Sequence, residues 1–449
     1  MSIASVVSKK STFLVILDWI GITLIFIFSF GDSSTNPRLW LDGKEFLLYA
    51  GYLLIFFTVF YIFDLYYPFK YFKKSNTLLD ASFAVALGAL IAAAAAYADR
   101  SFILPRLLFV GITSALIPIV FVNRLIYDWI FASHFLDQKT LILGSGALAA
   151  EIVEVINATP HSGIQMMGAV LERKEINKQN ISGIPVIGTF DDIVSLIDWY
   201  GIRLVVLCLN TTFESSEGRL VSQLFEKQVT VTSSVHLFER LTGRVPYEFY
   251  SNHYVIGIMA QIRSRPYLKL KRILDIAISF LLLIVMLPAL LLAIFVLAFE
   301  GPKNIFFIQD RVGKDGKLFS LIKLRSMKIN SKGKPTVTWF GKFIRKYRID
   351  EIPQIINVFK GDMSLIGPRP EMPQFVHKCR NNIPVYDVIH TVKPGLTGWA
   401  QVNFRYTKTI RDYQKKFKYN LYYLKNISFA LDVMIFLRTI RIVLLGMGQ

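Results

Sequence analysis

Two adjacent acids, Asp350 and Glu351, stand in the part of this chain that best suits carboxylate chemistry. Three of the four residues 345–348 that precede them are cationic, and a proline follows two residues later. Proline suits the first turn of a helix, so we expect a helix from Pro353 through Phe359 that leaves both acids near its positive end. That end and the cations favour ionised carboxylates. An ionised carboxylate can attack phosphorus or hold a divalent cation.

Other short motifs around this pair alternate turn residues with cations, a pattern that suits a surface holding phosphate groups. In chain order they are Gln309-Asp310-Arg311-Val312-Gly313, Lys323-Leu324-Arg325-Ser326-Met327, Gly367-Pro368-Arg369-Pro370 and residues 394–403, Pro-Gly-Leu-Thr-Gly-Trp-Ala-Gln-Val-Asn. The plain alternative for each is a solvated charged face, with the acid pair balancing nearby lysines.

The composition indicates a membrane protein with soluble domains. Of the 449 residues 53% are hydrophobic, which is too many for a purely soluble chain of this length. The formal net charge of +19 suits an anionic bilayer or phosphorylated substrates. It does not indicate nucleic acid, because no nucleic-acid-binding motif accompanies it. Cys208 and Cys379 lack CxxC spacing, which favours neither disulfides nor zinc and suits a reducing cytoplasm.

Four apolar segments, at 12–30, 46–66, 81–98 and 102–126, predict a transmembrane domain over residues 1–136. Each is long enough to cross about 30 Å of hydrocarbon. Basic residues mark the cytoplasmic helix ends, and they are Lys9, Lys10, Lys70, Lys73, Lys74 and Arg124. For Asp18, Asp64 and Arg106 we expect snorkelling to an interface; a partner inside the helix bundle is the alternative.

Residues 137–250 predict a Rossmann-like α/β domain. A strand runs into Gly144-Ser145-Gly146 and then into a helix at 150–156, and further strands are expected at 167–171, 204–209 and 229–232. Gly144 and Gly146 are candidate cofactor-binding residues that would bring backbone N–H groups to a pyrophosphate, with Glu172 placed to meet a ribose. The alternative is a tight turn that only packs the helix on its sheet.

A fifth apolar run, within 273–299, is long enough to span a membrane. Pro288 near its middle would bend a helix. A crossing here would place the basic remainder of the chain outside the cell, against the positive-inside tendency. We therefore predict a re-entrant helix, with a kinked crossing as the alternative. Residues 428–445 fit either an amphipathic interfacial helix or a packed core helix.

From Lys271 to the C-terminus the motifs resemble the bacterial sugar transferase family, the monotopic phosphoglycosyl transferases. The matching set, in order, is Lys271-Arg272-x-x-Asp275, Lys-x-Arg-Ser-Met, Asp-Glu-x-Pro-Gln, Gly-Pro-Arg-Pro and Pro-Gly-x-Thr-Gly-Trp-Ala-Gln-Val-Asn. The preceding helices and Rossmann-like module are similar to those of the long members, such as undecaprenyl-phosphate glucose or galactose phosphotransferases. Residues 262–449 are then a catalytic domain with a re-entrant helix and amphipathic interfacial helices.

The resemblance implies transfer of a sugar 1-phosphate from a UDP-sugar to undecaprenyl phosphate, with release of UMP, as the first membrane step of surface polysaccharide synthesis. It implies Asp350 as nucleophile and Glu351 as the ligand of Mg²⁺. The substrate-binding residues implied are Lys323, Arg325, Arg345, Arg369, Gln354 and Arg311. It further implies contact with membrane lipids, a homodimer, no nucleic acid, and a multi-pass protein of the bacterial inner membrane whose soluble domains face the cytoplasm.

Two positions depart from the family pattern: Phe404 replaces a glycine, and Asn420 replaces an aspartate. They leave open a non-catalytic scaffold that senses nucleotides or organises partners. A membrane-bound nucleotide-sugar dehydratase or epimerase is a further alternative, but it would need a TGxxGxxG turn, and the turn here is GSGALA.

Overall fold

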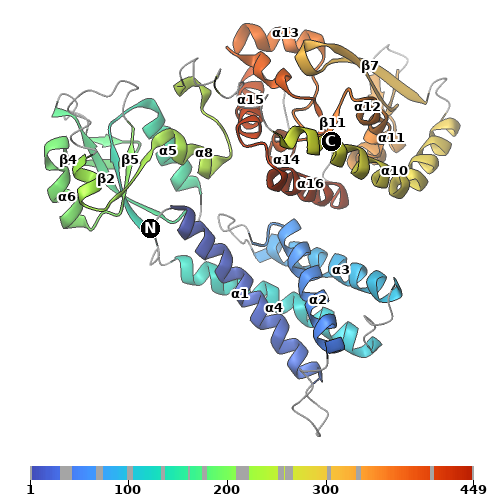
Figure 1. Ribbon diagram of the computed structural model, residues 1–449, viewed down its shortest axis with the longest axis horizontal. Coiled ribbons are helices and arrows are strands. Elements are labelled where there is room, and N and C mark those ends of the chain that lie inside the picture. Colours follow the sequence, from blue (N-terminus) through green and yellow to red (C-terminus); the bar gives the residue numbers. More distant parts are fainter. Residues whose placement is uncertain are drawn as a thin grey trace. The chain divides into compact units, whose positions relative to one another are not determined.

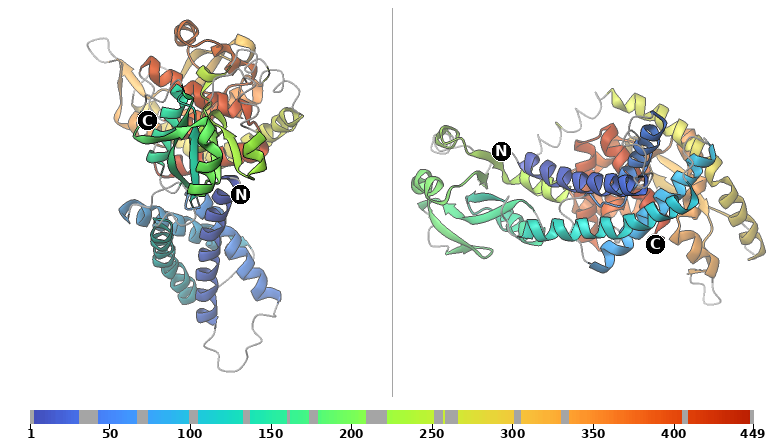
Figure 2. Two further views of the ribbon diagram at one scale, coloured as in Figure 1. Left: turned by 90° about the vertical axis from the view of Figure 1, so that its left-hand side faces the viewer. Right: turned by 90° about the horizontal axis from the view of Figure 1, so that it is seen from below.

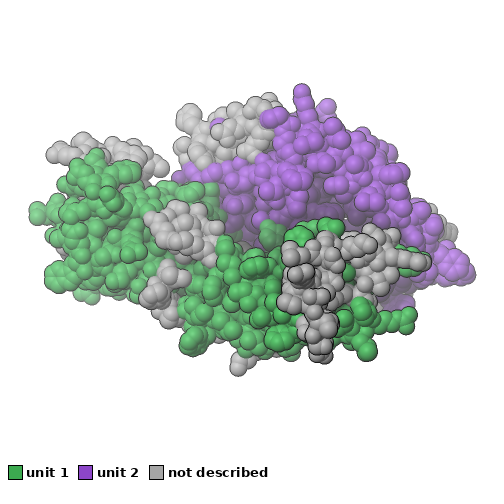
Figure 3. Space-filling model, turned by 60° about the horizontal axis from the view of Figure 1, so that its bottom comes forward, with its two compact units in different colours: residues 1–242 green, residues 243–449 purple. Residues whose placement is uncertain are grey.

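The computed structural model divides the chain into two compact units, residues 1–242 and 243–449 (Figure 3). The structure describes residues 3–30, 43–66, 74–98, 105–132, 137–159, 162–173, 179–208, 222–250, 257, 266–300, 305–329, 335–404 and 409–446. Lys70, Lys73 and residue 209, which the sequence analysis used, lie outside these ranges.

Unit 1 begins with four long apolar helices, as predicted (Figures 1 and 2). They are α1 (Ile3–Phe30), α2 (Gly43–Ile62), α3 (Lys74–Ala98) and α4 (Arg106–Ala132). The apolar stretches Lys10–Phe28, Thr77–Tyr97 and Arg106–Phe131 are long enough to cross a membrane, whereas the apolar stretch of α2, Phe46–Ile62, is shorter. Apolar side chains remain exposed along the helices, which suits a hydrocarbon surrounding.

The expected snorkelling is wrong for Asp18. Its carboxylate accepts hydrogen bonds from Arg124 and from Asn123, the latter at 2.9 Å, between α1 and α4. Both members of the Asp18–Arg124 ion pair are fully buried. A charge inside an apolar bundle is costly unless it is paired, and the partner here comes from a helix far along the chain.

A six-stranded sheet follows in unit 1, with the order β3-β4-β2-β1-β5-β6. Its strands are parallel except for the β3–β4 pair. This confirms the predicted mixed α/β content with a parallel sheet. The elements are β1 (Gln138–Leu143), α5 (Ala147–Ala158), β2 (Ile164–Leu171), β3 (Asn180–Ile181), β4 (Ile184–Thr189), α6 (Ile193–Tyr200), β5 (Leu204–Leu207), β6 (Thr230–Ser233) and α8 (Ser234–Thr242).

The glycine turn lies between β1 and α5, as the sequence predicted. Gly144 has φ 99°, a conformation that glycine adopts without steric cost. Gly146 caps α5, and a Cβ there would lie 3.3 Å from the carbonyl oxygen of Cys208. Residues 243–250, assigned to this domain by sequence, pack instead within unit 2, where Tyr247 contacts Phe417 edge-on.

Unit 2 contains α10 (Tyr267–Phe299), a continuous helix of 33 residues with Pro288 inside it. Side chains near both of its ends are buried, among them Asp275 at one end and Leu297 at the other. Between them many apolar side chains are exposed, including Phe280 and Leu292. In its most apolar stretch only 11% of the residues are buried inside the protein. This is the lowest share among the described helices that could span a membrane.

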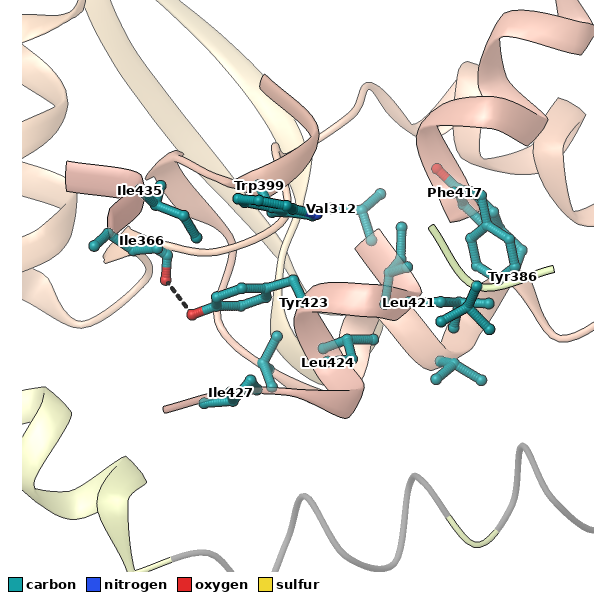
Figure 4. Close-up of a cluster of buried hydrophobic side chains, with 14 of the residues drawn as sticks. Val312, Ile366, Tyr386, Trp399, Phe417, Leu421, Tyr423, Leu424, Ile427 and Ile435 are labelled. Carbon is teal, nitrogen blue, oxygen red and sulfur yellow. Dashed lines mark hydrogen bonds between the residues drawn. The ribbon is translucent and has the colours of Figure 1, made fainter. Parts of the chain in front are cut away.

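The described part of unit 2 contains three short pairs of strands and several helices, and its largest hydrophobic cluster is shown in Figure 4. The elements are β7 (Phe306–Val312), β8 (Leu318–Leu324), β9 (Met327–Ile329), β10 (Pro335–Val337), α11 (Trp339–Lys346), η7 (Ile349–Gln354), α12 (Ile355–Lys360), β11 (Ser364–Ile366), α13 (Pro373–Asn382), η8 (Tyr386–Thr391), β12 (Gly395–Thr397), α14 (Trp399–Asn403), α15 (Ile410–Lys425) and α16 (Phe429–Leu444).

Helix α16 packs one face on this core through Leu431 and Ile435. Phe429, Val433 and Leu444 remain exposed. One face of α16 is therefore packed in the core, as the alternative predicted. That the exposed face lies at a membrane interface stays a prediction.

Candidate active site

The two acids lie in a pocket of about 510 Å³ within unit 2. Six cations and only these two carboxylates are among its lining residues, which are Phe307, Lys323, Leu324, Arg325, Ser326, Met327, Lys328, Pro335, Arg345, Arg348, Asp350, Glu351 and Arg369. The structure thus brings together six of the predicted site residues from separate motifs. The excess of positive charge suits a ligand with more than one phosphate.

A 3₁₀ helix, η7, carries the acids, and this corrects the predicted helix start. Pro353 lies near the end of η7, and α12 begins only at Ile355. Arg348, the residue directly before η7, adopts φ 55°. This left-handed conformation costs a non-glycine residue on the order of 1 kcal/mol. The carbonyl of Arg348 accepts a hydrogen bond from the Glu351 amide at 3.1 Å. The left-handed conformation closes the turn that holds both acids in the pocket.

Glu351 is held by two arginines. Arg369 Nη2 donates to its Oε1 at 3.0 Å, and Arg348 Nη1 donates to its Oε2 at 3.3 Å. Burial by itself would raise the pKa of Glu351, but the positive charges of Arg369 and Arg348 outweigh it and lower that pKa. Glu351 is therefore ionised, as the sequence predicted.

Asp350 behaves differently from its neighbour. Burial, followed by the negative charge of Glu351, raises the pKa of Asp350 to about 7, although Lys323, Arg345 and Arg369 oppose the shift. The expectation of a fully ionised Asp350 is thus wrong at neutral pH. Only 8% of the residue is exposed, so the cost of burying its charge outweighs the favourable cations.

Lys323, Arg325 and Arg345 reach the pocket from two elements that pack closely. The first two lie at and just after the end of β8, and the third lies in the last turn of α11. A Cβ on Gly341 in α11 would approach the Ser326 carbonyl oxygen to 2.1 Å. Only glycine permits this approach, which brings the helix against the Lys-x-Arg-Ser-Met segment.

Arg369 is positioned by the pairing of two motifs. Strand β11, before Gly-Pro-Arg-Pro, pairs with β12 of the Pro-Gly-x-Thr-Gly-Trp motif. A Cβ on Gly398 would lie 2.0 Å from the Gly367 carbonyl oxygen, so the two segments need glycine where they touch. The negative charge of Glu351 raises the pKa of Arg369, which keeps the guanidinium charged.

Four predicted residues do not line the pocket. Gln354 is buried at the end of η7. Arg311 donates to the Pro370 carbonyl oxygen at 3.2 Å and lies 3.9 Å from Glu371, so it supports the loop that carries Arg369. The other two, Gly144 and Gly146, lie in the turn between β1 and α5 of unit 1.

The two departures from the family pattern also lie outside the lining of the pocket. The ring of Phe404 stacks on Tyr419 with the centroids 6.4 Å apart, and Lys415 lies over it. Asn420 is buried in α15. Neither change removes a side chain from the pocket that holds Asp350.

A divalent cation fits the site only with help from a ligand. Within the described part of the chain, no group of three or more His, Cys, Asp or Glu side chains could hold a metal. Mg²⁺, however, commonly uses one or two carboxylates together with substrate phosphates. Glu351 is ionised, and a carboxylate offers about four lone-pair positions, so its two arginine contacts leave room for a cation.

Sequence reasoning noted Arg348 only as nearby charge and missed Phe307 and Lys328. Phe307 lies on β7, and Lys323 Nζ sits 5.1 Å from the centroid of its ring. A strand pairing brings these residues together. The register of this strand pair cannot be inferred from the spacing of the motifs. Arg348, by contrast, lies two residues before Asp350, and this position could have identified it as a site residue.

Comparison with known proteins gives two matches that together cover most of the chain. Residues 266–446 match the family described as bacterial sugar transferase, and residues 61–234 match one described as a CoA-binding domain.

Three similar proteins illustrate the match. Identity is 41% over 219 residues with a UDP-N-acetylgalactosamine-undecaprenyl-phosphate N-acetylgalactosaminephosphotransferase of Aeromonas hydrophila, covering 47% of this chain and about half, 51%, of that protein. It is 39% over 190 residues with an uncharacterized sugar transferase, EpsL, of Bacillus subtilis, covering 40% of this chain and 89% of that protein. It is 28% over 358 residues with an undecaprenyl-phosphate galactose phosphotransferase of Salmonella typhimurium, covering 74% and 73%.

Proposed function

The chain belongs to the bacterial sugar transferase family, and from that premise we propose that it transfers a sugar 1-phosphate from a UDP-sugar to undecaprenyl phosphate and releases UMP. One observation carries most of this proposal: a buried carboxylate, Asp350, shares a pocket with six cations. The names of the Aeromonas and Salmonella relatives agree with the reaction class. They name different sugars, so the test below uses a panel of donors.

In the first half of the proposed reaction, an Asp350 carboxylate oxygen attacks the phosphorus that bears the sugar. A bond forms between this oxygen and phosphorus, and the bond from phosphorus to the UMP oxygen breaks. UMP leaves with the electron pair, and the sugar phosphate remains on Asp350 as an acyl phosphate. Burial raises the pKa of Asp350 to about 7, so the pH controls how much of the protein carries the negative charge that attack requires.

In the second half, an oxygen of undecaprenyl phosphate attacks the same phosphorus. The acyl-phosphate bond breaks, which returns the carboxylate of Asp350, and the product is the sugar attached to undecaprenyl diphosphate. Both halves bring anions together, so the pocket cations contribute by holding phosphate oxygens. Arg369 offers a planar fork suited to this task while it also contacts Glu351.

We propose Glu351 as the residue that holds Mg²⁺ together with substrate phosphates. The bound cation would supply neutralisation of the phosphate charge. Glu351 contributes an ionised carboxylate fixed by two arginines, which is preorganised for a charged ligand. Removal of divalent cations with EDTA is expected to abolish UMP release, and added Mg²⁺ is expected to restore it.

The proposal also includes a re-entrant path for α10 at the cytoplasmic face of the inner membrane. Arg272, near one end, donates to the carbonyl oxygens of Val358 and Phe359. Near the other end, Leu297 packs in a cluster with Phe340 of α11. Both ends thus contact the same unit, while the middle exposes apolar side chains. Because α11 and α12 of the same unit hold both ends of α10, the helix is suited to enter and leave the membrane on the same side.

The direct test uses membranes containing the protein, undecaprenyl phosphate and a panel of UDP-sugars, with UMP release as the readout. We expect release with at least one donor and formation of a lipid-linked sugar diphosphate. Failure of every donor in the panel would contradict the proposed transfer for those sugars.

Asp350→Asn separates an enzyme from a non-catalytic scaffold. We expect it to lose UMP release and to form no phosphosugar adduct detectable by mass spectrometry after incubation with the donor alone. Asp315→Asn is the matched control, because Asp315 is exposed on the β7–β8 hairpin and asparagine tolerates its φ of 55°. An active Asp350→Asn protein would exclude this residue as nucleophile.

A further inference from the structure

A second, smaller cavity of about 130 Å³ lies near the N-terminal end of α10. Four of its lining residues are cations, namely Lys271, Arg272, Lys314 and Lys393. It shares no lining residue with the pocket that holds Asp350. The family match alone gives it no role.

The positive charge of this cavity is only partly neutralised. Lys271 pairs with Asp432 at 2.7 Å and lies 3.8 Å from Asp275. The other three cations form no ion pair with any residue that the structure describes. Among the described residues, Arg272 donates to the main-chain carbonyl oxygens of Val358 and Phe359.

The pKa of Lys393 reflects the excess of positive charge in the cavity. Burial, followed by the charge of Arg272, lowers the pKa of Lys393, against the opposing carboxylates of Asp275 and Asp362. An anion in the cavity would relieve the repulsion between these cations.

An apolar groove adjoins the cationic cavity. The two share Lys271, Asp275 and Ile366 as lining residues. Beyond them the groove is formed mostly by apolar side chains of α10, β11 and α16, among them Ile278 and Phe429. Asp432, whose carboxylate pairs with Lys271, also lines it. A ligand that fits both parts therefore has an anionic head and an apolar tail.

The exposed apolar surface of α10 begins directly beside the cationic cavity. Ile273, directly after Arg272, is 65% exposed, and Phe429 on α16 is 56% exposed. A row of cations at the edge of an apolar surface matches the headgroup level of a bilayer, where anionic lipids attract basic residues.

We propose that this cavity binds the headgroup of an anionic phospholipid, with the acyl chains along the groove between α10 and α16. The acceptor lipid is the less suitable occupant, because its phosphate must reach Asp350. Arg272 lies at the C-terminal end of α12, whereas Asp350 precedes its N-terminal end. A phosphate in the cavity is therefore kept away from the reacting carboxylate.

The test measures thermal stabilisation of the purified full-length protein in neutral detergent by dioctanoyl phosphatidylglycerol. Dioctanoyl phosphatidylcholine and inorganic phosphate are the parallel ligands. We expect phosphatidylglycerol to raise the Tm in a saturable way and the other two to leave it unchanged. Equal stabilisation by phosphatidylcholine would contradict recognition of the headgroup charge, and equal stabilisation by inorganic phosphate would identify a free-phosphate site instead.

The variant Lys314→Gln/Lys393→Gln removes two of the unpaired cations. We expect its affinity for phosphatidylglycerol to fall about 30-fold, at about 1 kcal/mol per cation. Lys342→Gln/Lys378→Gln removes the same charge from exposed positions elsewhere in unit 2 and should bind as the unaltered protein does. Unchanged affinity in the Lys314/Lys393 variant would overturn the proposal.

Two further measurements keep the result interpretable. The single variant Lys314→Gln alters only an exposed side chain, so it reports on binding even if the double variant folds poorly. The KM for undecaprenyl phosphate is expected to stay the same in the double variant. A raised KM for undecaprenyl phosphate would assign the cavity to the acceptor and overturn the phospholipid assignment. Absence of UMP release with every donor would contradict the proposed reaction and would leave the lipid-binding result unaffected.

Discussion

Asp350 and Glu351 are neighbours in the chain, yet their surroundings separate their acidities. Two arginines hold Glu351 ionised, whereas burial and the charge of Glu351 raise the pKa of Asp350 to about 7. Pairs of carboxylates separated in this way commonly divide chemical roles between them. This division fits Asp350 as the group that gains and loses a covalent bond and Glu351 as a permanent charge.

The pH profile of the first half-reaction is the first prediction at this scale. Attack requires the deprotonated carboxylate, so the rate of the UMP burst without acceptor should rise with pH and level off above about 7. Below that value it should fall about tenfold per pH unit. Omitting the acceptor removes the titration of its own phosphate, whose second pKa is near 6. A burst rate independent of pH between 5.5 and 8 would contradict a pKa near 7 for the attacking carboxylate.

Stability provides an independent check on the same group. The folded-state pKa of Asp350 lies above its unfolded value, so its contribution to stability is present at low pH and is lost as the pH rises through about 7. Asp350→Asn removes this loss. Its Tm relative to the unaltered protein should therefore increase between pH 5 and pH 8, and a variant of lower Tm at pH 8 would contradict the predicted cost of burying the charge.

Arg369→Lys is the second prediction. Lysine keeps the charge but lacks the planar fork that can contact Glu351 and a phosphate together. Loss of a charged hydrogen bond costs about 1.5 to 3 kcal/mol, so kcat/KM should fall roughly 10- to 100-fold. Arg411→Lys, at an exposed position on α15, is the control and should be neutral. Full activity of Arg369→Lys would show that charge alone suffices there.

At the scale of elements, the path of α10 determines on which side of a membrane the candidate active site would lie. Its length and composition by themselves suit a crossing. Its contacts with α12 near one end and α11 near the other suit a return to the same side. Pro288 lies in the exposed stretch between those contacts, where a bend is compatible with both anchors.

Labelling of single cysteines tests the path of α10. Gln223→Cys lies before α10 and His377→Cys lies after it; both positions are exposed, while the native Cys208 and Cys379 are buried. A re-entrant α10 predicts that a membrane-impermeant maleimide labels both in inside-out vesicles and neither in spheroplasts. Ser34→Cys, between the first two helices in sequence, serves as the external reference. Labelling of the two positions from opposite sides would establish a crossing.

At the scale of the molecule, the chain separates into two compact units, and the pocket with Asp350 belongs wholly to residues 243–449. The Bacillus relative is matched over 89% of its length by only 40% of this chain. A related sugar transferase can therefore be much shorter than this chain. All described residues that line the pocket lie between Phe307 and Arg369 of unit 2.

The corresponding prediction concerns residues 243–449 expressed alone in membranes. We expect UMP release with kcat/KM within about tenfold of the full chain, because the pocket and α10 are intact. Near-ultraviolet circular dichroism and detergent-solubilised size-exclusion chromatography verify folding. A folded but inactive fragment would show that unit 1 takes part in the reaction.

The sequence by itself determined the apolar helices of unit 1, the glycine turn after β1 and the motifs that line the pocket. These features are local: a run of apolar residues predicts a helix, and glycines adapt a turn wherever the chain folds. Six of the predicted site residues meet in one pocket because their motifs flank the turns and strand ends that form it.

Only the tertiary structure decided how charged groups behave. The pairing of Asp18 with Arg124, the support of the Arg369 loop by Arg311, and the raised pKa of Asp350 all depend on partners distant in the chain or on burial. Electrostatic free energies vary with distance and with exclusion of water, and neither is written in residue order. The sequence thus pointed to the carboxylate that we propose as nucleophile, and burial in the fold raises its pKa.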